Sequence, residues 1–93
     1  MATFMVICTF KQDTVMDEVF AVVAEETAQV KALEAQGRIG AIHLSMARGT
    51  VFLEIFADDP AGAEETVHTL PMSKWWDLDI FPIAPPAISG GAS

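Results

Sequence analysis

Glu26 is the residue in this chain of 93 whose position most clearly suggests chemistry. Apolar residues recur at helical spacing between residues 15 and 33, and Glu26 falls in the middle of that apolar stripe. Burial of a carboxyl group raises its pKa, which is how a general base that works near neutral pH is made. We therefore take Glu26 as the candidate catalytic base. The alternative is a slightly rotated helix whose edge lets Glu26 reach water.

A histidine and a second glutamate could assist such a base. Two alternating segments predict a β-hairpin, and a two-residue turn at Arg48-Gly49 would set His43 directly opposite Glu54. The carboxylate would fix the tautomer of the imidazole and leave its other nitrogen free to move a proton. A structural ion pair is the alternative. Whether the two residues share a pocket with Glu26 depends on which face of the sheet the helices cover, and the sequence leaves that open.

Four further residues are candidates for substrate binding: Arg48, Thr50, Phe52 and Trp75. Arg48 is one of five cationic residues and could bind the carboxylate of an acidic substrate, unless it is an ordinary solvated turn residue. Trp75 offers a flat surface to a ring-shaped ligand, or else fills a contact between protomers. No acids and histidines have metal-ligand spacing, so we expect neither a metal nor a cofactor.

Hydrophobic periodicity and turn signals predict six elements that must position these residues. They are a strand over residues 2–10, a helix from Asp13 or Thr14 to about 36, strands over 39–46 and 50–57, a helix from 58–60 to 70, and a strand over 75–83. This order predicts an α+β ferredoxin-like βαββαβ plait, a four-stranded antiparallel sheet with two helices on one face. The plait would form a single domain over residues 1–83, followed by a C-terminal arm or flexible tail over residues 84–93.

The sheet face without helices is also predicted to be apolar, because both alternating sets of the first strand are hydrophobic. A second copy packed face to face would bury that surface. We therefore expect a homodimer with a barrel-like centre, the dimeric α/β barrel, or a larger homo-oligomer built from it.

The composition disfavours several classes of partner. Thirteen Asp and Glu against five Lys and Arg give a formal charge of −8, which repels nucleic acid and anionic membrane surfaces. The single cysteine, Cys8, cannot form an intrachain disulfide, and no apolar run is long enough to span a membrane. These features predict a cytoplasmic protein whose partners are a small-molecule ligand and further copies of itself.

The segment LPMSKWWDLDI at residues 70–80 resembles the muconolactone delta-isomerase family of dimeric α/β-barrel proteins. The resemblance covers residues 4–83. Members of that family rearrange a small unsaturated lactone by proton transfer and assemble from dimers into larger rings. The resemblance implies that Glu26, eleven residues before Gly37, is the proton-transfer glutamate. A tyrosine of the related enzymes would fall near Thr50, but this chain contains no tyrosine.

These observations predict a muconolactone isomerase-like protein that binds a small lactone or organic acid, with Glu26 as base and His43 and Glu54 as its helpers. Because the tyrosine is missing, the alternative is a non-catalytic protein of the same fold that binds a small metabolite or serves in assembly. A third hypothesis is cofactor-free oxygenation of an aromatic compound, a reaction that also occurs on this architecture.

Overall fold

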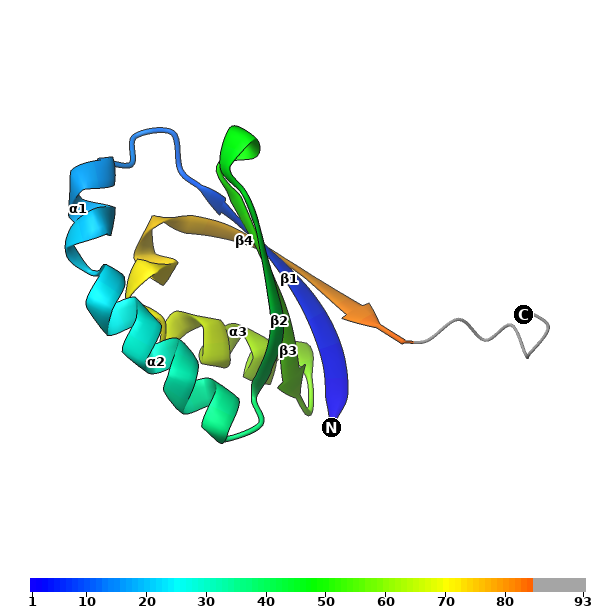
Figure 1. The fold of residues 1–93 in the computed structure, drawn as a ribbon. Coiled ribbons are helices and arrows are strands. Elements are labelled where there is room, and N and C mark those ends of the chain that lie inside the picture. The colour runs from blue at the N-terminus through cyan, green and yellow to red at the C-terminus, as the bar shows by residue number, and fades with distance from the viewer. Residues whose placement is uncertain (85–93) are drawn as a thin grey trace.

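Alternating apolar residues build a four-stranded antiparallel sheet in the computed structural model, which describes residues 1–84 (Figure 1). The strands are β1 (Ala2–Phe10), β2 (Ile39–Ser45), β3 (Thr50–Ala57) and β4 (Trp76–Ile83). The helices are α1 (Met16–Ala21), α2 (Val23–Ala35) and α3 (Pro60–His68), with the 3-10 turns η1 (Met46–Arg48) and η2 (Pro71–Trp75). The predicted C-terminal arm lies outside the described residues, apart from Ala84.

The strands lie in the order β2-β3-β1-β4, and every neighbouring pair is antiparallel. All three helices lie on one side of this sheet, and the other side is open (Figure 1). The predicted ferredoxin-like plait is therefore confirmed. None of the helices in residues 1–84 is both long and apolar enough to cross a membrane.

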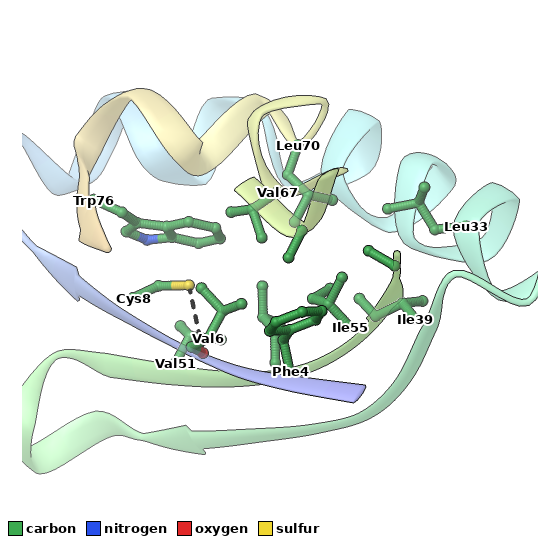
Figure 2. Close-up of a cluster of buried hydrophobic side chains, with 13 residues drawn as sticks. Phe4, Val6, Cys8, Leu33, Ile39, Val51, Ile55, Val67, Leu70 and Trp76 are labelled. Carbon is green, nitrogen blue, oxygen red and sulfur yellow. Dashed lines mark hydrogen bonds between the residues drawn. The ribbon is translucent and has the colours of Figure 1, made fainter. Parts of the chain in front are cut away.

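The hydrophobic core fills the space between the helices and one face of the sheet (Figure 2). Every second residue of β1 and β3 points into it, including Val6, Cys8 and Ile55, each fully buried. Leu33 of α2 and Leu70 after α3 close the core from the helix side. This layer fixes which face of each strand meets the helices, because strand side chains alternate.

The predicted continuous first helix is wrong, because the chain forms two helices that break at Val22. The backbone of Val22 leaves the helical region at φ −108° and ψ 12°. Val22 and Val23 are β-branched and weaken a helix, and the break turns α1 relative to α2, as Figure 1 shows. The predicted cap is also wrong. Neither Asp13 nor Thr14 caps the helix, since the residue before α1 is Val15 and it makes no side-chain cap bond.

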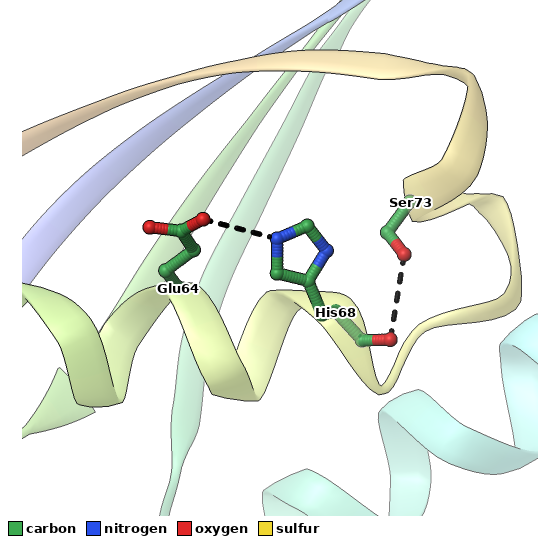
Figure 3. Close-up of polar contacts among 3 residues, drawn as sticks. All are labelled: Glu64, His68 and Ser73. Carbon is green, nitrogen blue, oxygen red and sulfur yellow. Dashed lines mark hydrogen bonds and ion pairs between the residues drawn. The ribbon is translucent and has the colours of Figure 1, made fainter.

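The second predicted helix, α3, begins as predicted and ends at His68, two residues before the predicted end. The Oδ1 atom of Asp59 accepts a hydrogen bond from the Gly62 N–H at 2.7 Å, and Pro60 occupies the first turn of α3. On the solvent side, His68 pairs with Glu64 at 3.2 Å, and the Ser73 hydroxyl donates to the His68 carbonyl (Figure 3). Both side chains of the His68 pair are 55% exposed, so it is a solvated surface pair with little effect on stability.

The predicted turn and pairing of the hairpin are wrong by two residues. The chain connects β2 to β3 through η1 and Gly49, whose left-handed φ of 56° suits a residue without a Cβ. Because this connection is longer than the predicted turn, His43 pairs with Phe52 instead of Glu54. A bulge between Ile39 and Ile42 also interrupts the ladder.

Candidate functional site

Glu26 lies in the first turn of α2 and faces the sheet, as the apolar stripe predicts. Its carboxylate accepts a hydrogen bond from the backbone N–H of Met72 at 3.0 Å. Burial raises the pKa of this carboxyl group above its ordinary value of 4.5, and the bond from Met72 lowers it by a smaller amount. The site therefore contains a half-buried acid whose neutral form is favoured more than usual.

The segment after α3 positions the partner of Glu26. Pro71 begins η2, and this turn carries the Met72 backbone back to α2, 46 positions away along the chain from Glu26. The same turn leads into Trp76, the first residue of β4, which is 5% exposed. The indole N–H of Trp76 is buried and has no hydrogen-bond partner among residues 1–84.

An apolar hollow of about 200 Å³, which we call the inner cavity, lies between α2 and the sheet. Its lining is Glu26, Val30, Ile42, Leu44, Val51, Leu53, Met72 and Trp76. Glu26 is the one ionisable side chain in that set. Such a lining removes water from the carboxyl group, which is the physical cause of its raised pKa.

A second hollow of about 160 Å³, the outer cavity, adjoins the inner one, since Leu44, Val51 and Met72 line both. The rest of its lining is Phe10, Met16, Val19, Phe20, Val23 and Met46. Several of these residues are strongly exposed, including Phe20 at 62% and Met46 at 78%. The outer cavity thus opens to solvent through an apolar rim between α1 and the hairpin tip.

Cys8 lies beneath this region in the core and does not act as a nucleophile at neutral pH. Burial, with a smaller contribution from the charge of Glu26, raises the pKa of its thiol to about 12. The ionised Glu26 carboxylate thus opposes ionisation of the thiol. The thiol itself stays neutral over the range in which Glu26 titrates, so Cys8 brings no charge to the site.

His43 and Glu54 do not share a pocket with Glu26, a point that the sequence left open. Both lie on the open face of the sheet, since the neighbouring residues Val51 and Leu53 point into the core. Glu26 lies on the helix-covered side. The three residues therefore do not form one catalytic group.

Glu54 has a structural partner instead of His43. Its Oε1 atom accepts a hydrogen bond from the backbone N–H of Ala41 at 2.9 Å, inside the bulge of β2. A bulge leaves an N–H without a partner in the ladder, and here a carboxylate supplies the missing acceptor. A hollow of about 280 Å³ beside Glu54 is bounded by Thr3, Ile83 and Ala84, where the described residues end.

The four predicted substrate-binding residues lie outside both apolar cavities. Arg48 is an exposed residue of η1, and its carbonyl accepts from the Thr50 hydroxyl at 2.9 Å. Phe52 lies on the open face. Trp75 belongs to η2 instead of the predicted strand, and the Lys74 ammonium lies 4.5 Å from the centre of its ring.

Sequence reasoning missed Met72, Leu44 and Trp76 as parts of the site. The alternation of β4 places Trp76 toward the core, which is a signal for burial but not for a cavity wall. No sequence pattern reveals the Met72 bond, because it uses a backbone N–H.

Within residues 1–84, no three His, Cys, Asp or Glu side chains gather as a metal site would need.

A search against protein-family models finds no match for this chain, and a search of curated proteins finds none either.

Proposed function

We propose that this protein is a proton-transfer isomerase of small unsaturated lactones, similar to muconolactone delta-isomerase, with Glu26 as the base. The single observation that carries the proposal is a carboxyl group in an apolar cavity, held by one hydrogen bond from the Met72 N–H. A base in such a place has a pKa closer to neutral, which favours exchange of protons with carbon acids.

The proposed reaction needs only one proton and no external reagent. The Glu26 carboxylate takes a proton from the carbon next to the lactone carbonyl, and the electron pair of that C–H bond spreads into a dienolate. The protonated carboxyl group then returns the proton to the far carbon of the dienolate. The double bond has moved, and Glu26 is again a carboxylate.

The bond from Met72 supports this role by fixing the carboxyl group without adding a counter-charge. A salt bridge would lower the pKa of Glu26 strongly, whereas a backbone N–H lowers it less than burial raises it. One carboxylate oxygen accepts that bond, so the second oxygen is available to a ligand in the inner cavity. Neither His43 nor Glu54 takes part in the proposed mechanism.

The test follows exchange and isomerisation of the neutral α-angelica lactone in D₂O by proton NMR. We expect the protein to accelerate loss of the C–H signal next to a carbonyl, and Glu26→Gln to slow this by about 100-fold or more. Glutamine keeps an oxygen that can accept from Met72, so the variant should fold. Glu25→Gln, an exposed neighbour on the same helix, is the matched control and should keep full activity.

Exchange that is equal in the wild type and Glu26→Gln would refute Glu26 as the base. If the folded wild type gave no acceleration with this lactone, the isomerase proposal would fail, and the non-catalytic role would be the better account.

We also propose that the protein forms a homodimer through the open face of the sheet. Half-buried apolar side chains gather there on the two central strands, namely Met5 and Ile7 of β1 with Phe52 and Phe56 of β3. A monomer would leave this sheet face in water, whereas a second copy packed on it would bury both.

A further inference from the structure

The charge of the two cavities limits the ligand that they can hold. Glu26 is the one ionisable group in the lining of either cavity, and no Lys, Arg or His lines them among residues 1–84. An anionic ligand would lose its hydration next to apolar walls and gain no counter-charge. The formal charge of −8 on the whole chain adds a repulsive field for anions.

The size and shape of the cavities indicate more than one ring. A dry cavity of about 150 Å³ is known to accept one benzene ring in another protein. Here an inner cavity of about 200 Å³ adjoins an outer one of about 160 Å³, and the two share three lining residues. Space for one ring in each of two adjoining cavities corresponds to a ligand of about two rings.

Aromatic side chains line both cavities and favour a flat ligand. Trp76 of the inner cavity and Phe10 of the outer cavity form an edge-to-face pair, with ring centroids 5.9 Å apart. Phe20 stands at the exposed rim. Aromatic surfaces of this kind pack well against flat rings. An exposed apolar rim is itself typical of a binding site.

We propose that the ligand of this site is an uncharged, flat molecule of about two rings, which lies along both cavities and brings one carbonyl or hydroxyl group to Glu26. This inference rests on the proposed function for the role of Glu26 and narrows its substrate class. It excludes organic acids as ligands, and it implies that the outer cavity binds the part of the ligand that does not react.

The test compares 2-naphthol with 2-naphthoate by calorimetry at pH 7, using the full chain. The two probes share the fused rings but differ in charge, so we expect 2-naphthol to bind at least about tenfold more tightly, since an unpaired buried charge is costly. Val23→Trp should fill the outer cavity and weaken 2-naphthol at least tenfold, while leaving the affinity for phenol, a single ring, unchanged. Thr27→Trp places the same side chain on an exposed position of α2 that lines neither cavity, and is the control.

Equal or tighter binding of 2-naphthoate would overturn the inference, and so would failure of both naphthyl probes to bind. An unchanged affinity of Val23→Trp for 2-naphthol would overturn occupancy of the outer cavity. Binding and isomerase activity can be distinguished. Glu26→Gln should still bind 2-naphthol. If the wild type binds 2-naphthol but does not accelerate proton exchange, this inference stands and the isomerase proposal is refuted.

Discussion

At the scale of single residues, Glu26 and Cys8 show how one apolar environment acts on two acids. Burial is the larger cause of the raised pKa in each, and the charge of Glu26 adds to the effect on Cys8. For Cys8 the result is an inert core thiol. For Glu26, which also faces a cavity, the same cause gives the raised pKa that the proposed base needs.

The raised pKa of Glu26 also makes stability depend on pH. Between the ordinary pKa of 4.5 and the higher folded-state value, the folded protein holds a proton that the unfolded chain has released. The contribution of Glu26 to the free energy of unfolding should therefore be greatest below that window and fall as the pH rises through it. Glu26→Gln removes this contribution, so its stability relative to the wild type should rise with pH.

Urea unfolding from pH 4 to pH 8 would measure the effect. Glu25→Gln, with the same change of net charge at an exposed position, is the comparison. A pH dependence that is the same in both variants would show that burial of Glu26 has no energetic consequence.

At the scale of elements, the bulge of β2 is held by a contact between neighbouring strands. A Cβ at Gly40 would collide with the Glu54 carboxylate oxygen that accepts from Ala41, and would come within 3.0 Å of the Phe56 ring. Space favours glycine at this position, since a Cβ would force the Glu54 carboxylate or the Phe56 ring to shift, and the backbone of Gly40 does not have a positive φ. The glycine and the glutamate should behave as one unit.

We expect Gly40→Ala to lower the free energy of unfolding by roughly 1–2 kcal/mol in the wild type, since either the carboxylate or the strand must shift. In a Glu54→Ala background the collision with the carboxylate is gone, so the same substitution should cost less. A double-mutant cycle measured by chemical denaturation tests this coupling. Additive effects of the two substitutions would contradict it.

The elements also show what the sequence could and could not predict. Side chains in a strand alternate with period two, so a shift of two residues keeps every residue on its face but changes its partner. For that reason it was predictable that Val51 and Leu53 share one face, whereas the opposition of His43 and Glu54 was not. The partner depends on the length of the turn, and η1 with Gly49 is longer than the pattern suggested.

The position of Glu26 was predictable because Val30 and Leu33 follow it at i+4 and i+7 within α2, so the break at Val22 does not disturb that face. Its hydrogen bond was not, because the Met72 N–H belongs to a turn whose path depends on tertiary packing. The face that the helices cover was not predictable either, since β1 is apolar on both sides.

At the scale of the whole molecule, the two faces of the sheet divide the proposed functions between them. The helix-covered face forms the cavities, and the open face would form the contact with a second copy (Figure 1). This division predicts that assembly and ligand binding can be changed independently.

Phe52→Asp should convert the expected dimer to a monomer, because it places a charge in the centre of the open face. Phe20→Asp introduces the same charge at an exposed position on the helix side and should leave the dimer intact. Sedimentation velocity at tens of micromolar measures both. A wild type that sediments as a 10.0 kDa monomer would contradict the assembly proposal.

The central claim is that the Glu26 carboxyl group is held away from water between α2 and the sheet. Titration of its side-chain carbon by ¹³C NMR measures this most directly, with the assignment made by comparison with Glu26→Gln. We predict a midpoint clearly above 4.5 in the folded protein. A midpoint at or below that value would contradict the site described for Glu26 and the chemistry proposed from it.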